Sequence, residues 1–384
     1  MSRRARATIA LLAIAACART PAAPTSAAAP APVVWRDENR NLVTDVVFGD
    51  DVVYALTQDR RLRAWTGDAQ PVRTLSLAPV FALAADGSVA ATKTKDGEDS
   101  DRLDLWALPA LTRVRTRSFK HGIDMVLAVS PAAAYLRLNF HNHGHRDDGA
   151  VMAMPPPLFS DAFWNFAADT VIENRSYPCD PPGVLPGMFM FSGDARRFAC
   201  TDGWDVEWID LPSDDRARPD LAADWRPPPA TPTNELNFTG TKPRGRGAPP
   251  PHSVLSLRLR PDGRDVYVTY RRDEVEGGGW RLERWTPGKA GDPGQLTRLA
   301  ATNTAAFTKV LAISGDGSLA VLGSWREPLV VRRAPRYEAQ PLAAEAATAA
   351  AVSSDGQRIA SGHLDGTLRL WDARTGRLIA TAGP

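Results

Sequence analysis

Three histidines alternate with other residues in one short segment, and this is the clearest candidate metal-binding pattern in the chain. His141, His143 and His145 are followed closely by Asp147. Alternate residues of an extended segment lie on one side, so the three imidazoles could converge on a transition metal with a carboxylate as a further ligand. Histidine-rich tracts also bind metal only weakly, because a built site gathers ligands from several elements. Both interpretations stay open, and no other cofactor is expected.

No other pattern predicts a reaction. The sequence contains no Gly-x-Ser-x-Gly elbow, P-loop, His-Glu-x-x-His or paired-cysteine metal motif. The 46 Lys and Arg residues nearly balance the 44 Asp and Glu residues, so the composition does not indicate a nucleic-acid binder that depends on phosphate contacts. The sequence therefore indicates a function only through the fold and the compartment that it predicts.

The N-terminus predicts export. Arg3, Arg4 and Arg6 precede a short apolar run that ends in Ile14-Ala15-Ala16-Cys17, which is the order of a secretion signal. The run is about half of the twenty residues that a membrane-spanning helix needs. The tetrapeptide resembles the lipobox of bacterial lipoproteins, which implies cleavage after residues 1–16 and acylation of Cys17. An ordinary signal peptide, with Cys17 incidental, is the alternative.

The segment after the signal and the two other cysteines fit an exported protein. Residues 17–32 are rich in Ala, Pro, Thr and Ser and should form a flexible tether between a lipid anchor and a folded body. Cys179 and Cys200 are expected to pair as a disulfide in an oxidising compartment. Two separate buried thiols are the alternative, because spacing alone does not show that the two side chains meet.

The C-terminal residues carry a repeating strand and turn pattern. Asp355-Gly356, Asp365-Gly366 and Thr375-Gly376 separate four short apolar segments, and the third segment ends in Trp371-Asp372. This stretch resembles a WD40 repeat, which implies one four-stranded blade of a β-propeller. Within the repeat, Ser361, Asp365, Trp371 and Asp372 match structural positions of the motif. The histidine that such repeats carry before the innermost strand is missing ahead of Val352.

Weaker copies of the pattern extend upstream. The third strands of these copies are expected around Trp65, Trp106, Met152, Trp208, Trp285 and Arg332, and that of the C-terminal repeat around Trp371. We therefore predict an all-β, seven-bladed propeller of four-stranded antiparallel blades over residues 33–384, with insertions near 155–187 and 213–252. An eight-bladed ring stays open, and so does a quinoprotein-like variant, since the segment Asp372–Arg377 resembles that repeat.

Two functions from different classes follow from this architecture. The leading hypothesis is a lipid-anchored, exported protein-protein interaction platform of the bacterial cell envelope, with its body in the periplasm or at the cell surface. We expect a monomer that binds a protein partner on the loop-bearing face, contacts the membrane through its lipid and binds no nucleic acid. The alternative is a periplasmic propeller enzyme, a hydrolase of the lactonase type or an oxidoreductase, with a ligand at the central channel. The mainly apolar innermost segments, such as 311–313, favour the platform.

Overall fold

The computed structural model describes most of the predicted repeat region. The described residues are 42–50, 52–66, 71–75, 79–97, 100–119, 123–131, 135–140, 160–165, 169–174, 189–201, 205–210, 234–237, 252–272, 279–287, 294–302, 308–324 and 326–383. The chain divides into two units, Met1–Trp35 and Arg36–Pro384. Every described residue belongs to the second unit, so the predicted signal, Cys17 and tether lie outside the described residues.

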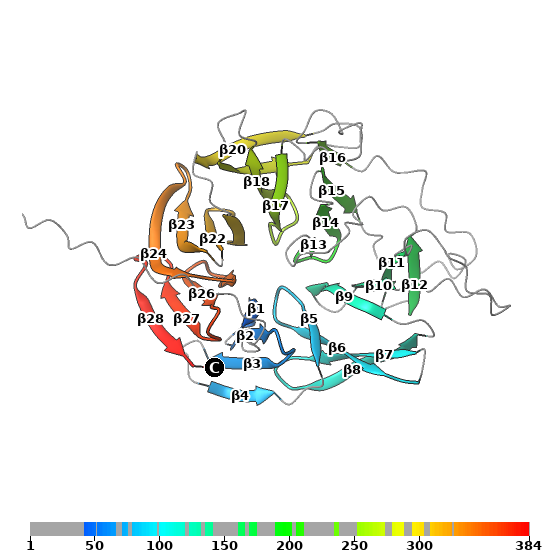
Figure 1. Ribbon diagram of the computed structural model, residues 1–384. Helices are drawn as coiled ribbons and strands as arrows, with labels where there is room; N and C mark the ends of the chain where they lie inside the picture. The colour runs from blue at the N-terminus through cyan, green and yellow to red at the C-terminus, as the bar shows by residue number, and fades with distance from the viewer. Residues whose placement is uncertain are drawn as a thin grey trace, which may run out of the picture. The chain divides into compact units, whose positions relative to one another are not determined.

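The described strands form four-stranded antiparallel sheets, each made of four consecutive strands (Figure 1). The first three contain β1 (Val43–Phe48), β2 (Val52–Thr57), β3 (Leu62–Thr66) and β4 (Pro71–Leu75); β5 (Val80–Leu83), β6 (Val89–Lys95), β7 (Asp101–Ala107) and β8 (Thr112–Phe119); and β9 (Ile123–Val129), β10 (Tyr135–Phe140), β11 (Ser160–Asn165) and β12 (Thr170–Asn174).

Four more sheets follow along the chain. They contain β13 (Phe189–Phe191), β14 (Arg197–Thr201), β15 (Asp205–Asp210) and β16 (Asn234–Asn237); β17 (His252–Leu259), β18 (Val266–Arg272), β19 (Trp280–Thr286) and β20 (Gln295–Thr302); β21 (Lys309–Ile313), β22 (Leu319–Ser324), β23 (Glu327–Arg333) and β24 (Glu338–Ala346); and β25 (Ala349–Val352), β26 (Arg358–Gly362), β27 (Leu368–Asp372) and β28 (Leu378–Ala382).

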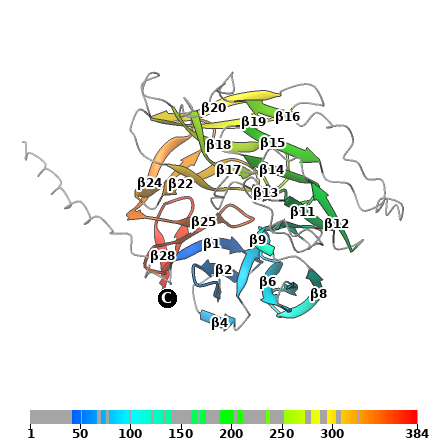
Figure 2. The same ribbon diagram turned by 45° about the vertical axis from the view of Figure 1, so that its right-hand side comes forward.

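The sheets follow one another in a cycle. The first strand of one sheet contacts the first strand of the next at β5 and β9, β9 and β13, β13 and β17, β17 and β21, and β21 and β25, and β25 contacts β1. Residues of the first and second sheets share one apolar cluster, so the cycle closes among the described strands. The first strands are therefore the innermost ones, as the two views in Figures 1 and 2 show. The predicted all-β fold of antiparallel four-stranded sheets is confirmed, whereas the blade count of the whole chain stays a prediction.

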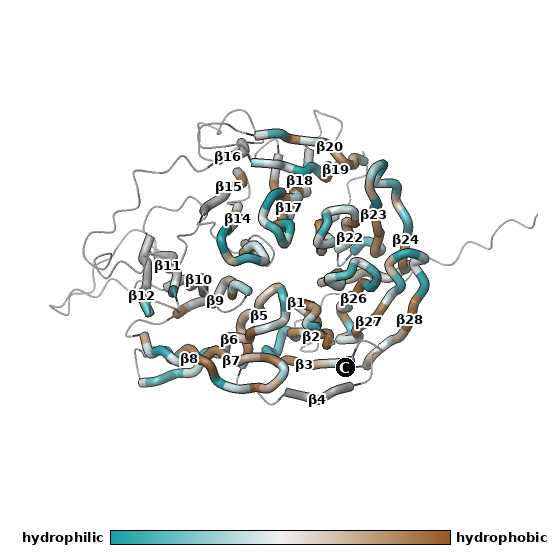
Figure 3. The backbone as a smooth tube through the Cα atoms, turned by 180° about the vertical axis from the view of Figure 1, so that it is seen from behind, coloured by the Kyte–Doolittle hydropathy of each residue, from teal (hydrophilic) through white to brown (hydrophobic). Residues whose placement is uncertain are grey.

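The core lies between neighbouring sheets. One cluster packs Ala199 and Val206 of the fourth sheet against Leu257, Val268 and Trp285 of the fifth. Both faces of an inner strand pack against neighbouring sheets, which fits unbroken buried runs such as that of β22. Figure 3 shows apolar stretches within the strands and hydrophilic residues at many turns. Each large apolar side chain buried in this way contributes about 1.5–3 kcal/mol.

Asp-Gly turns join the first strand of a sheet to its second at repeated positions. The glycines at 87, 263, 317 and 356 have φ between 68° and 71°, a conformation that residues with a Cβ adopt at a cost. The preceding aspartate accepts a backbone hydrogen bond from the residue two positions on, as Asp316 does from Ser318. In the fourth sheet Ala195 takes the positive φ position, at 55°.

The third sheet differs from the sequence interpretation. Its third strand is β11, which pairs with β10 and contains the fully buried Trp164, whereas the expected position, Met152, lies outside the described residues. Strands β11 and β12 fall inside the expected insertion 155–187, and β16 falls inside 213–252. The third strand lies further along the chain than Met152, because the connection between the second and third strands is longer here than in the other sheets. No helix in the described part of the chain is long and apolar enough to cross a membrane.

Candidate functional site

Several residues singled out by sequence lie outside the described ranges. These are Cys17, Cys179 and the candidate metal ligands His141, His143, His145 and Asp147. Among the described residues, no group of three or more His, Cys, Asp or Glu side chains could hold a metal ion. Cys200 is fully buried in β14, and its pairing with Cys179 stays a prediction.

The C-terminal motif places two of its four residues in a buried hydrogen-bond network. Trp371 Nε1 donates to Ser361 Oγ at 2.9 Å, and the same oxygen lies 2.9 Å from His363 Nε2. His363 Nδ1 lies 2.8 Å from the carbonyl oxygen of Ala346. A carbonyl only accepts, so Nδ1 carries the proton, and Nε2 of a neutral imidazole accepts from Ser361. A histidine in the turn after β26 thus joins Ser361 and Trp371, although the histidine that such repeats carry before the innermost strand is missing.

The other two motif residues stabilise turns. Asp365 accepts from the backbone nitrogen of Thr367 at 2.9 Å and from its hydroxyl at 2.7 Å. Asp372 accepts from the nitrogen and the hydroxyl of Thr375, both at 2.7 Å. These side-chain hydrogen bonds lower the pKa of both carboxyl groups, although burial opposes them at Asp365. Their role in the structure is local, because the partners lie two or three residues away.

The His363 network also lies where the last sheet meets the first. The backbone nitrogen of Val43 donates to the carbonyl oxygen of His363 at 3.3 Å. Thr348 Oγ1 lies 2.6 Å from the carbonyl oxygen of Val43. The turn that carries His363 therefore fixes the junction between β1 and the last sheet.

Three charged side chains whose burial the structure describes lie on the innermost strands, and we call them the central charge group. They are Asp45 of β1, Arg258 of β17 and Lys309 of β21. All three are partly accessible to solvent. The sequence interpretation emphasised apolar innermost segments and missed Asp45 and Arg258. The sequence could have indicated them only as charged residues within otherwise apolar strands, because a charge that faces the centre is costly without a partner.

The electrostatics of the central charge group act across the cycle of sheets. Burial raises the pKa of Asp45 to about 6, while attraction to Arg258 and a hydrogen bond from the nitrogen of Val46 oppose the rise. Burial lowers the pKa of Lys309, and repulsion by Arg258 lowers it further. Strands β1 and β17 belong to sheets that are not neighbours in the cycle. The group therefore gathers charges from different sheets around the centre.

We predict that Asp45→Asn makes stability less dependent on pH. The folded-state pKa of about 6 exceeds the reference 3.8, so Asp45 stabilises the protein below the lower value, and this contribution is lost as pH rises through 6. Asn should raise the free energy of unfolding by about 1–3 kcal/mol near pH 7.5 and change it little near pH 4. Urea denaturation at both pH values would measure the difference.

Asp316→Asn should change the free energy of unfolding near pH 7.5 in the opposite direction. Hydrogen bonds from Ser314 and Ser318 lower the pKa of Asp316 to about 2, so the ionised carboxylate stabilises the folded state above pH 3.8 and the benefit is lost as pH falls through 2. Its replacement should destabilise the protein near pH 7.5 and much less at the acidic limit. Equal pH profiles for Asp45→Asn and the unaltered protein would contradict the assignment.

A second group combines cations with an aromatic ring. The guanidinium carbon of Arg60 lies 4.8 Å from the centroid of the Phe81 ring, and Lys93 Nζ lies 5.1 Å from it. Phe81 is partly exposed and Arg60 is exposed. Lys93 and Lys95 also lie within 3.8 Å and 3.2 Å of the buried carboxylate of Asp101. We call Arg60, Phe81 and Lys93 the cation–aromatic patch.

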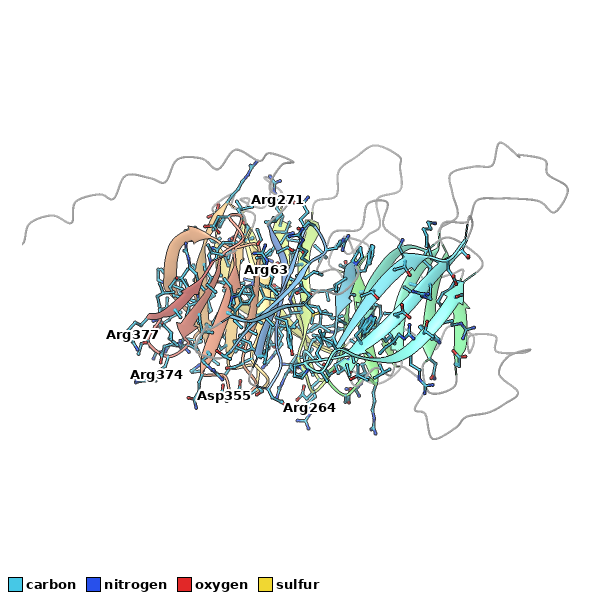
Figure 4. All side chains as sticks on the ribbon, turned by 90° about the horizontal axis from the view of Figure 1, so that it is seen from below. Arg63, Arg264, Arg271, Asp355, Arg374 and Arg377 are labelled. Carbon is cyan, nitrogen blue, oxygen red and sulfur yellow. The ribbon has the colours of Figure 1, made fainter. Side chains whose placement is uncertain are left out.

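The two sets of turns lie at opposite edges of the sheets. In Figure 4 Arg271, at the end of β18, points away from the edge that carries Arg264, Asp355, Arg374 and Arg377. Arg264 and Asp355 belong to turns between first and second strands, and Arg60 belongs to the turn between β2 and β3. Strand direction therefore places the cation–aromatic patch on the Arg271 side.

Comparisons with known proteins identify the fold and no family. No protein-family model matches the chain, and no curated protein matches it. Hydrazine synthase of Kuenenia stuttgartiensis superposes with a TM-score of 0.55 at 10% identity, covering 89% of this chain and 98% of that chain. The β-propeller domain of Myceliophteria thermophila Cps50 (Swd1) gives 0.52 at 12% identity, covering 86% and 96%. The chain thus has the β-propeller fold.

Proposed function

We propose that this chain is a lipid-anchored, exported β-propeller that serves as a protein-protein interaction platform in the cell envelope. The N-terminal signal and the lipobox-like Cys17 support export and membrane anchoring, and the propeller fold supplies a rigid surface. Propellers present many turns on a stable framework, and binding residues are often carried by such turns. The described turns are fixed by side-chain hydrogen bonds, for example those that Asp316 and Asp355 accept.

The cation–aromatic patch carries this proposal. Phe81 is partly exposed, and its ring contacts two cationic side chains. Aromatic and arginine side chains dominate the binding energy of many interfaces, because they bury large areas and combine apolar with polar contacts. A ring that stays partly exposed in spite of these contacts would gain from being covered by a partner. We therefore assign the Arg271 side of the propeller as the docking face.

Crosslinking in intact envelopes followed by affinity isolation tests the proposed function. The unaltered chain should yield one partner in a fixed ratio, and Phe81→Ala should reduce its recovery about tenfold or more. Arg374→Ala, on the opposite edge, should retain the partner at the parental level. If the partner is recovered equally with all three proteins, or if no partner is recovered, the platform function is wrong and the enzymatic alternative is favoured.

The lipid anchor has its own experiment. Cys17→Ser removes the acylated thiol, so the chain should move from the membrane fraction to the soluble fraction, because the remaining contacts include no lipid chain. Cys200→Ser removes a cysteine of the folded body, which we expect in a disulfide, and should leave any folded product in the membrane fraction. A Cys17→Ser protein that stays fully with membranes would rule out this anchor.

A further inference from the structure

The cation–aromatic patch contains an arginine whose backbone conformation favours glycine. Arg60, in the turn between β2 and β3, has φ of 65°, which a residue with a Cβ adopts at a cost. In the turn between β26 and β27 the same position is taken by Gly366, with φ of 82°. The nitrogen of Arg60 donates to the carbonyl oxygen of Thr57 at 2.8 Å, and that of Gly366 donates to the carbonyl oxygen of His363 at 3.2 Å. The last sheet thus shows that glycine fits this turn without strain, whereas Arg60 strains it.

The strained turn places Arg60 beside Phe81. The carbonyl oxygen of Arg60 accepts from the backbone nitrogen of Val80 at 2.9 Å, and the guanidinium carbon lies 4.8 Å from the centroid of the Phe81 ring. A cation–aromatic contact at an exposed site stabilises a fold only weakly. Stability therefore does not explain an arginine here, and residues in such strained conformations often belong to binding sites.

The guanidinium group of Arg60 is available to a partner. Arg60 is exposed, and among the described residues its side chain has neither a hydrogen bond nor an ion pair. The carboxylate of the preceding Asp59 is already bound, because it lies 3.1 Å from Nε of Arg61 and accepts from Oγ1 of Thr57 at 2.5 Å. The turn itself therefore holds no carboxylate for Arg60.

The other cation of the patch has partners within the protein. Lys93 Nζ lies 3.8 Å from the carboxylate of Asp101 and donates to the carbonyl oxygen of Ile123. The same carboxylate accepts from the backbone nitrogen of Ile123 at 2.7 Å, so Lys93 and Asp101 hold the second and third sheets together. The patch thus offers a partner one uncommitted guanidinium group, that of Arg60, beside a partly exposed ring.

We propose that the cation–aromatic patch binds an acidic segment of the protein partner, in which a carboxylate pairs with Arg60 and an apolar neighbour covers Phe81. A guanidinium group binds a carboxylate through two parallel hydrogen bonds, which fixes the orientation of the segment. A lipid surface fits the patch less well, because binding at a membrane interface needs a large apolar face and the patch offers a single ring. This inference rests on the proposed platform function and names the chemistry of the partner.

Selection of random peptides, displayed on phage, against the full chain tests this recognition. The selected peptides should be enriched in Asp or Glu next to an apolar residue. Arg60→Gly should bind a selected peptide about tenfold or more weakly in fluorescence anisotropy, because a charge-assisted pair is lost. The melting temperature of Arg60→Gly should not fall, because glycine adopts the positive φ without strain. Weaker binding in this variant would therefore not arise from unfolding.

Two controls isolate the pair between Arg60 and the carboxylate. Arg61→Gln removes the neighbouring arginine, which is paired with Asp59, and should leave the affinity unchanged. A selected peptide with Asn in place of its Asp, or Gln in place of its Glu, should bind the parent more weakly but should bind Arg60→Gly as the acidic peptide does. This double-mutant cycle measures the pair directly.

The outcomes that contradict this inference differ from those that contradict the platform. The inference is wrong if the parent selects no acidic peptides, or if Arg60→Gly melts as the parent does and binds the peptide equally well. A crosslinked partner that depends on Phe81 but not on Arg60 would leave the platform intact and overturn the acidic recognition, whereas the absence of any crosslinked partner contradicts the platform itself. Sedimentation of the Cys17→Ser chain with phosphatidylglycerol vesicles, abolished by Arg60→Gly, would assign the patch to a lipid surface instead.

Discussion

Gly317→Ala should lower the free energy of unfolding by about 4 kcal/mol or more. Gly317 has φ of 71°, which costs a residue with a Cβ about 1–2 kcal/mol. An added Cβ would also collide with the hydroxyl of Tyr267, which is 1% exposed. That hydroxyl and the hydroxyl of Tyr337 both donate to the carbonyl oxygen of Gly317, at 3.2 Å and 2.8 Å. Moving the turn would therefore leave two buried hydroxyl groups without this acceptor, at a cost of about 1–3 kcal/mol each.

Gly356→Ala is the matched control for this prediction. Gly356 occupies the same turn in the last sheet, with φ of 69°, and an added Cβ there meets nothing within 4 Å. Its backbone nitrogen donates to the carbonyl oxygen of Ser353 at 2.9 Å, just as that of Gly317 donates to the carbonyl oxygen of Ser314 at 2.9 Å. Only the conformational cost of about 1–2 kcal/mol should remain. Urea denaturation measures the decrease in the free energy of unfolding for both variants. Equal decreases would show that the tyrosine contacts do not stabilise the protein.

The repeat architecture was accessible from the sequence because its signals are local. An Asp-Gly pair such as Asp316-Gly317 predicts a turn, since glycine adopts positive φ without a steric penalty. Alternating apolar and polar residues on either side predict strands with one buried face, and short unbroken apolar runs predict fully buried strands. The fourth sheet departs from this rule, because Ala195 has the positive φ there. Even so, Asp194 accepts a hydrogen bond from Arg196 at 3.0 Å, as the aspartates of the other turns do from the residue two positions on.

The contents of the candidate site were harder to predict because they depend on contacts between distant strands. Nothing near Asp45 in the sequence indicates that Arg258 attracts it from across the cycle. The same holds for His363, which joins Ser361 and Trp371 from a turn where the repeat pattern does not require a histidine. Trp164 was missed for a third reason. The apolar residues around Met152 indicate a third strand there, whereas the long connection after β10 places the third strand at β11.

The closing junction of the cycle should also be sensitive to added volume. We expect Gly362→Ala to lower the free energy of unfolding by about 3–4 kcal/mol, because overpacking a rigid core costs about 1–3 kcal/mol and more where the neighbours cannot move. The added Cβ would lie 2.6 Å from Cβ of Val43 and 3.1 Å from Cγ2 of Val46. Both valines belong to β1, and Val43 is 1% exposed. The backbone of Val43 is also held by Thr348 and His363, so β1 has little room to shift.

Gly323→Ala separates this steric effect from the general effect of a glycine replacement. Gly323 occupies the same position in β22, at the same distance from its Asp-Gly turn, but an added Cβ there meets the ends of Leu311 and Leu329 at 3.3 Å. Flexible leucine ends can move by a few tenths of an ångström, so the change should stay within about 1 kcal/mol. Val43→Ala should partly rescue Gly362→Ala by removing the methyl groups but not the Cβ. Without that rescue in a double-mutant cycle, the loss would have to arise within the last sheet, and the contact between β1 and β26 would not be what closes the propeller.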